Sequence, residues 1–338
     1  MDKGAWQIAV LFAGAALGGT YLGGYEWLRF FAYFGSWGTI GVVLASLALG
    51  WFGYSVLSIC YRAHIRSLHE LFLHWFGEAF GPTLSVLTHL FLLAYAGVIT
   101  GQFAMQAPAG ASPLLFVLVP LLVAIVWLQK GWSWLITGMS VSLATGFLLF
   151  GLIFLEQPHV PIPNLGYQMN LNWIVHALLY VGLHFLLCLA VAIPLVKHVA
   201  HHQSIRLGVG IGSLLFFLLL ITGHAILLSY WHDVHASASP FKLIMLQLIP
   251  KGDWLLGLFS LFHGGVLIAA ILYALAEPIT DRHDLHLLPL LLVMLSFLAL
   301  FALLPMALSW SVPLVASGTT YCGLSLLIRF IWKRQAPK

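Results

Sequence analysis

Four glycines, a threonine and a glutamate interrupt an apolar stretch near the N-terminus, in the run GGTYLGGYE at 18–26. Lipid tolerates a broken helix only where the freed N–H and C=O groups are buried in protein or line a cavity. The run therefore predicts a place where a solute or an ion is held. Its candidate solute-binding residues are Gly18, Gly19, Thr20, Tyr21, Gly23 and Gly24.

Glu26 is the first candidate for ion or proton coupling, because ionisable residues at membrane depth are usually functional. It follows the glycines by two residues, so it would begin the outer half of an interrupted helix and be stabilised by the helix dipole. Arg29 lies three residues further on, within pairing distance on the same helical face. A structural cap with an ion pair to Arg29 is the alternative to a coupling role.

The sequence contains 16 histidines, and most lie at the ends of apolar segments, where the imidazole is readily solvated. A neutral imidazole can exchange a proton near physiological pH. We therefore assign His184 and His263 to proton coupling, and His184 also to solute binding. A buried histidine that only hydrogen-bonds a carbonyl is the simpler alternative for each. The histidines that lie deeper in apolar segments are His89, His176, His184, His224 and His263.

Composition predicts a membrane protein over the whole chain. Of 338 residues, 61% are hydrophobic and 7% are charged, against roughly 25% charged in soluble domains. The cysteines Cys60, Cys188 and Cys322 stand in apolar stretches without CxxC spacing, so we expect free thiols. No P-loop, HExxH or GxSxG motif lies on a plausible scaffold. We therefore expect no enzyme, no cofactor, no metal and no nucleic-acid partner.

A bilayer core of ~30 Å calls for about 20 apolar residues per helix. Of the 14 Lys and Arg, only Arg29, Lys242 and Lys251 lie at one set of span ends. The other set is therefore the cytoplasmic side, so both termini are predicted to be cytoplasmic. The predicted spans, ten in one domain at 1–338, lie near 5–34 (interrupted), 38–60, 82–105, 113–129, 133–155, 171–197, 205–230, 253–275, 286–304 and 311–332.

Ten spans divide into two sets of five, which we interpret as inverted repeats at about 5–155 and 171–332. Transporters of that design bind solute where the first helix of each repeat unwinds near the midplane. Gly182 lies near the centre of the sixth span, between Tyr180 and His184. We therefore expect a second, weaker break there, with Tyr180 and Gly182 in the site. Close helix packing, as in GxxxG contacts, is the alternative role for such glycines.

A pattern of small residues, an acidic residue and aromatics surrounds the first break. Tyr25 and Gly23 precede Glu26, and a second pattern runs from Tyr180 through Pro194-Leu195 to RLGVGIG at 206–212. Together these segments resemble the YkvI-like family of bacterial membrane proteins. That family usually has Gln where Tyr25 stands, another small residue where Gly23 stands, and Asn where His184 stands. The positions that fit its opening motif are Gly18, Gly24, Glu26, Phe30, Phe31 and Gly35.

The resemblance implies the amino acid–polyamine–cation transporter superfamily. That superfamily implies an all-α polytopic membrane protein with the LeuT-type five-plus-five inverted repeat and broken helices 1 and 6. In this arrangement one sodium site takes Ser or Thr hydroxyls from span 8, where only Ser260 is available and His263 occupies the middle. Hard cations need several oxygen ligands, so we expect proton coupling or facilitated transport rather than sodium coupling. Tyr95, on span 3, is a candidate for the opposite wall of the site.

Three functions remain open from the sequence. The first is a secondary transporter of a small solute, for which an amino acid is one candidate, working by alternating access. The second is a sensor or receptor subunit that has kept a transporter fold. The third is a haem- or metal-binding membrane redox protein, suggested by the histidines, although no second helix carries a pair that matches His176 and His184.

Overall fold

The structure is a computed structural model that describes residues 2–108, 110–156, 171–308 and 310–335. Every regular element in those residues is helical, which confirms the predicted all-α class. Eight of the described helices are long and apolar enough to cross a membrane. Two shorter apolar helices, Lys3–Leu17 and Pro113–Leu128, accompany them. The predicted multi-pass membrane architecture is confirmed at this level.

The helices follow one another in the order of the predicted spans, with short 3-10 segments (η) between some of them. The first half contains α1 (Lys3–Leu17), η1 (Tyr21–Gly23), α2 (Tyr25–Phe30), η2 (Ala32–Phe34), α3 (Gly35–Arg62), α4 (Leu68–Gln102), η3 (Phe103–Gln106), α5 (Pro113–Leu128) and α6 (Trp132–Glu156). The second half contains α7 (Asn172–Ala192), η5 (Ile193–His198), α8 (His202–Ser229), α9 (Trp231–Val234), α10 (Pro240–Leu248), α11 (Gly252–His283), α12 (Leu287–Ala307) and α13 (Ser311–Gln335).

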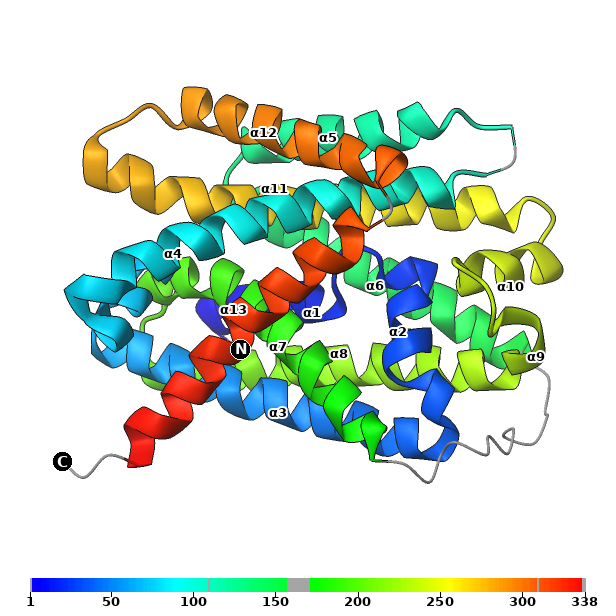
Figure 1. Ribbon diagram of the computed structural model, residues 1–338, viewed down its shortest axis with the longest axis horizontal. Coiled ribbons are helices and arrows are strands. Elements are labelled where there is room, and N and C mark those ends of the chain that lie inside the picture. Colours follow the sequence, from blue (N-terminus) through cyan, green and yellow to red (C-terminus); the bar gives the residue numbers. More distant parts are fainter. Residues whose placement is uncertain (1, 109, 157–170, 309, 336–338) are drawn as a thin grey trace.

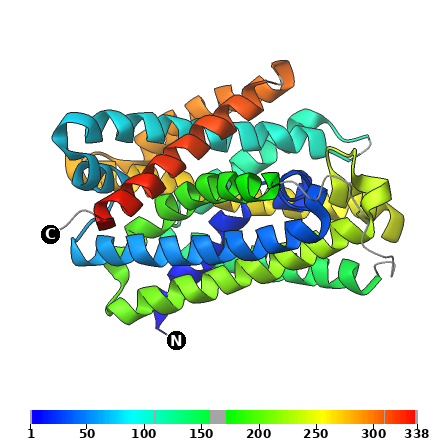
Figure 2. The same ribbon diagram turned by 60° about the horizontal axis from the view of Figure 1, so that its bottom comes forward.

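The helix α1 lies in the interior, packed against α6, α7 and α8. In Figure 1, α5 and α12 form one long edge of the molecule, and α3 and α8 form the opposite edge. Figure 2 brings α3 and α8 forward, side by side. The close approach of α8 to α1 depends on Gly208 and Gly212, where an added Cβ would come within 2.7 Å of the carbonyl oxygens of Ala5 and Ala9. This is the small-residue packing typical of membrane helices.

The connections gather at two opposite ends of the bundle. The α3–α4 turn, the α11–α12 connection and the C-terminal end of α13 lie at one end, on the left of Figure 1. The short helices α9 and α10 lie at the other end, on the right. The long helices therefore run along the same axis, as spans of one bilayer would.

The spans predicted near 82–105 and 253–275 are longer than expected, because both Gly81-Pro82 and Glu277-Pro278 lie inside helices. The helix α4 begins at Leu68 and passes through Pro82, and its backbone departs from helical geometry at Gly77 instead, where φ is 74°. The helix α11 passes through Pro278 and ends at His283, and the next residue, Asp284, has φ 51°. A proline removes one backbone hydrogen bond, and both helices continue despite that loss.

The predicted break at Gly182 is wrong, because α7 runs without interruption from Asn172 to Ala192. A Cβ on Gly182 would lie 2.8 Å from Cγ of Leu324, and Gly323 on α13 faces the Gly182 carbonyl. This glycine therefore allows α7 and α13 to pack closely, which is the alternative role considered for it. The backbone of this span changes only at its end, where η5 begins at Ile193 and contains Pro194.

Candidate functional site

The predicted break in the first span is confirmed. The helix α1 ends at Leu17, and Gly18 then adopts φ 79° and ψ 166°, which side-chain-bearing residues rarely adopt. Gly24 has φ 79° in the left-handed region and leads into α2. An added Cβ would lie 2.7 Å from His184 Cε1 at Gly18 and 2.6 Å from the Phe241 ring at Gly24. Backbone geometry and lack of space both require glycine at these two positions.

Side chains from α7 donate to carbonyl groups in the last turn of α1, where the Ala15 carbonyl also accepts from the Gly18 backbone N–H at 3.2 Å. The Tyr180 hydroxyl donates to the Ala16 carbonyl at 3.0 Å. The His184 Nδ1 lies 3.3 Å from the Ala15 carbonyl oxygen, so this ring nitrogen carries the hydrogen. Both side chains are fully buried. The last carbonyls of a helix need such partners when water cannot reach them, so these contacts hold the broken end in place.

His263, on α11, holds the next carbonyl of the break. Its Nε2 lies 3.1 Å from the Gly18 carbonyl oxygen, and its Nδ1 lies 2.6 Å from Oγ of Ser142 on α6. The ring is fully buried. Because a carbonyl only accepts, Nε2 is the donor, and in the neutral ring the Ser142 hydroxyl donates to Nδ1. His263 therefore joins α6, α11 and the break.

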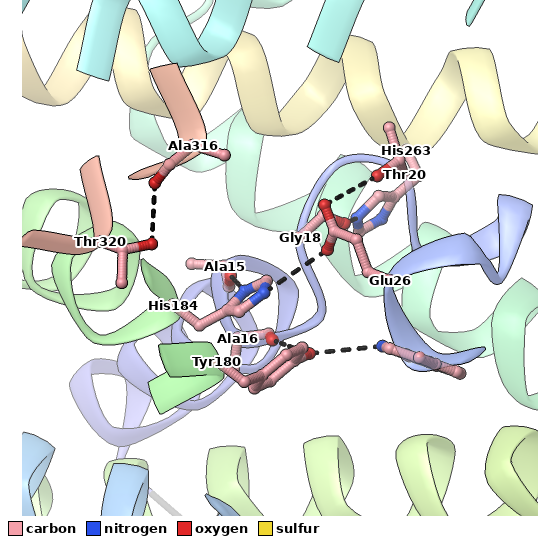
Figure 3. Close-up of polar contacts among 11 residues, drawn as sticks. Ala15, Ala16, Gly18, Thr20, Glu26, Tyr180, His184, His263, Ala316 and Thr320 are labelled. Atoms are coloured by element: carbon pink, nitrogen blue, oxygen red, sulfur yellow. Dashed lines mark hydrogen bonds and ion pairs between the residues drawn. The ribbon is translucent and has the colours of Figure 1, made fainter. Parts of the chain in front are cut away.

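Glu26 lies between the break and α7, as Figure 3 shows. Its Oε2 is 3.6 Å from His184 Nε2, and its Oε1 accepts a hydrogen bond from the Thr20 hydroxyl at 3.3 Å. Since His184 uses Nδ1 to donate to Ala15, its other nitrogen faces the carboxylate. The contact is longer than a hydrogen bond, and within the described residues neither Oε2 of Glu26 nor Nε2 of His184 has a hydrogen-bond partner.

The predicted ion pair between Glu26 and Arg29 is not formed. Among the described residues, the ion-pair partner of Glu26 is His184. The Arg29 guanidinium instead lies over the rings of Tyr25 and Tyr33, at 5.2 and 4.8 Å from their centroids. These are cation–π distances. The acidic and basic groups of α2 thus remain separate, because Glu26 pairs with His184 on α7 and Arg29 packs against aromatic rings.

A cavity of about 560 Å³ opens beside the break. Thr20, Glu26 and Arg29 line it on the side of the break and α2, and Gln102 and Gln106 line it from the end of α4 and from η3. Side chains of α7 and α13 complete the wall. The cavity thus offers a carboxylate, a guanidinium and two amides among apolar side chains, a composition that suits a small polar solute.

The other predicted site residues have more varied positions. Tyr21 packs edge-on against the His263 ring at 4.7 Å. Tyr95 is buried on α4 near Glu26, and its hydroxyl has no hydrogen-bond partner within the described residues. A Cβ on Gly19 would lie 2.6 Å from the Ile99 side chain. Gly23 lines the cavity.

Gly19, Tyr21 and Tyr95 thus pack at the break, whereas Gly182 packs against α13. Among the other deep histidines, His224 bonds to Thr39 at 3.0 Å and His89 bonds to the Ser85 carbonyl at 2.7 Å. Neither contact involves the break.

Ser142 is the contributor that the sequence prediction missed. Its neighbours on α6, Ser140 and Thr145, donate to backbone carbonyls four residues earlier, as hydroxyls in helices commonly do. Only the arrangement of α6 beside α11 places Ser142 against His263. The described residues contain no group of three or more His, Cys, Asp or Glu side chains that could hold a metal ion.

These features define a class of membrane protein: an all-helical bundle with a broken first helix enclosed by its neighbours. The solved structure of MhsT in complex with L-phenylalanine is similar to this chain, with a TM-score of 0.62 and 16% sequence identity. The match covers 96% of this chain and 88% of MhsT. No protein-family model matches the sequence, and no curated protein matches it. The likeness shows a LeuT-type fold, whereas the ten spans, the five-plus-five repeat and membership of the YkvI-like family are not confirmed.

Proposed function

We propose that the protein is a secondary transporter that moves a small solute across a bacterial plasma membrane by alternating access. The LeuT-type fold, the broken first helix and the cavity beside it support this function. The similar protein MhsT was solved with L-phenylalanine bound. A cavity of about 560 Å³ that contains both a carboxylate and a guanidinium suits an amino-acid-like solute.

We infer ten spans, with α1 and α5 as the two short ones, in a single domain at 1–338. Repeats at about 5–155 and 171–332 then follow from the five-plus-five organisation. The distribution of Lys and Arg supports cytoplasmic termini, because the connections at the end of the bundle near the C-terminus carry most of the positive charge.

The contact between Glu26 and His184 carries the proposal of proton coupling. In this proposal the coupling proton binds between these two side chains, because a carboxylate without a charged partner in a largely buried position costs several kcal/mol. A solute that enters the cavity meets the same carboxylate, because Glu26 lines the cavity wall. Binding of a positively charged group there would change the free energy of holding the proton. Solute binding and proton binding are therefore linked.

Sodium coupling is disfavoured by the same contacts. In transporters with broken helices, the exposed carbonyls coordinate the coupling cation. Here Tyr180, His184 and His263 already donate to the carbonyls of Ala16, Ala15 and Gly18. Proton-coupled or facilitated transport is the function that remains.

The test begins with a thermal-shift screen of amino acids and amines against the purified protein. Solutes that bind are then supplied to proteoliposomes under a proton gradient, a sodium gradient or no gradient. We expect the proton gradient to accelerate uptake, and we expect Glu26→Gln to lose that acceleration. The matched control Glu78→Gln changes an exposed carboxylate on α4 and should behave like the wild type.

Each alternative has its own outcome. Uptake that is driven only by sodium would refute proton coupling, and uptake that is equal under all gradients would indicate facilitated transport. Binding without any movement of solute would refute transport and favour the sensor or receptor.

A further inference from the structure

A second cavity, of about 630 Å³, lies between the start of α4 and the last turns of α11. It shares no lining residue with the cavity beside the break. Arg66 and His69 line it at the start of α4, His89 lines it further along that helix, and Arg282 lines it from α11. This cavity therefore belongs to a separate site, at the end of the bundle where the sequence places most of its positive charge.

The acidic residues that line this cavity already have partners. Lys197 lies 3.1 Å from Glu277 and 3.6 Å from Asp281. Glu277 also accepts a hydrogen bond from Trp132 Nε1 at 3.0 Å. Glu70 accepts a hydrogen bond from the backbone N–H of Arg66 at 2.7 Å. These contacts engage the carboxylates, so they compete less for the arginines nearby.

The basic groups of the cavity keep free donors. Arg66 and Arg282 are exposed, and within the described residues neither guanidinium has a hydrogen bond or an ion pair. The His69 Nδ1 bonds to the Ser85 hydroxyl at 3.0 Å, and the His89 Nδ1 bonds to the Ser85 carbonyl at 2.7 Å. Because the neutral His89 ring donates through Nδ1, its Nε2 is an acceptor, so the free donors for an anion are those of the two guanidinium groups. His69 and Arg282 line the same cavity.

Apolar side chains border the same cavity. Val86 and Leu90 line it from α4 and are 59% and 46% exposed, and Ile279 lines it from α11 and is 36% exposed. On a membrane helix these exposed side chains face acyl chains. A ligand that occupies the cavity thus meets guanidinium groups at one side and hydrocarbon at the other.

We propose that this cavity binds the phosphate headgroup of an anionic phospholipid, with Arg66 and Arg282 on the phosphate and acyl chains along Val86 and Leu90. Guanidinium groups bind phosphate through paired charge-assisted hydrogen bonds. The cytoplasmic leaflet, where the charge distribution places this end of the bundle, is rich in anionic lipid. A soluble phosphate would use the arginines but would leave the apolar border without a role, so the lipid fits the whole cavity.

The test uses native mass spectrometry of the full-length protein in detergent, with phosphatidylglycerol, phosphatidylcholine and inorganic phosphate as probes. We expect phosphatidylglycerol to bind more tightly than phosphatidylcholine. The double variant Arg66→Gln/Arg282→Gln should bind it about tenfold more weakly, on the usual strength of hydrogen bonds to charged groups. The matched double variant Arg62→Gln/Arg206→Gln removes two exposed arginines outside the cavity and should bind like the wild type.

Three results would overturn the proposal: equal binding of both lipids, equal loss in both double variants, or full displacement of the lipid by millimolar inorganic phosphate. The last result would identify a site for a soluble anion. Thermal unfolding without added lipid checks that each variant is folded. If the cavity double variant does not fold, Arg282→Gln alone provides the same comparison, because this exposed residue lies in the last turn of α11.

Discussion

Gly18→Ala is the substitution with the most specific structural consequence. The new side chain must adopt φ 79° and ψ 166°, a conformation that costs about 1–3 kcal/mol in a residue other than glycine. Its Cβ would also lie 2.7 Å from Cε1 of His184. His184 must then move and weaken its hydrogen bond to Ala15, which is worth about 0.5–1.5 kcal/mol. Together these effects predict a loss of about 2–4 kcal/mol of stability.

Thermal unfolding of the purified protein, followed by tryptophan fluorescence, measures this loss. On the unfolding entropy per residue of soluble proteins, Tm should fall by roughly 3–6 °C. The control is Gly151→Ala, on α6, because no atom lies within 4 Å of the Cβ that it adds; alanine there should leave Tm unchanged or slightly raised. If Gly18→Ala were as stable as the control and moved solute normally, the account of the break would be refuted.

Two further substitutions test the packing around the break. Ser142→Ala removes the partner of His263 Nδ1, so it should lower the stability of the protein by about 0.5–1.5 kcal/mol and slow solute uptake. The control is Ser140→Ala, whose hydroxyl bonds only its own helix and which should not slow uptake. Equal uptake by the two variants would contradict the role of Ser142. Gly182→Ala places a Cβ 2.8 Å from Leu324 and should lower Tm by an overpacking cost of about 1–3 kcal/mol. An increase in Tm would contradict the packing role of Gly182.

The break could be predicted from the sequence because its signal is local. Glycines, Thr20 and Glu26 inside an apolar run have few roles in a membrane helix, and the structure places a broken helix there. His184 and His263 were predicted because they lie deep in spans 6 and 8, which line the central site in the LeuT-type arrangement. The structure brings both rings to carbonyls of the first helix. Their roles in proton coupling remain predictions.

The parts that could not be predicted depend on contacts between distant segments. Gly182 has the same local surroundings in the sequence as a glycine at a break, and its packing role depends on Gly323 in another helix. Ser142 resembles the other hydroxyl residues of α6 until that helix is placed beside α11. Arg29 stands within reach of Glu26 on one helix, but aromatic rings offer it a different partner. Spacing along one segment does not determine which of several partners is nearest.

The proton balance of solute binding tests the central claim most directly. A solute that binds is added to the weakly buffered protein, and a pH indicator records the protons that are taken up or released. If Glu26 and His184 hold one coupling proton, the wild type should take up or release up to roughly one proton per bound solute. The variant Glu26→Gln should take up or release almost none. Replacing sodium by potassium should not change either result. Binding that requires sodium and moves no protons in the wild type would contradict the account.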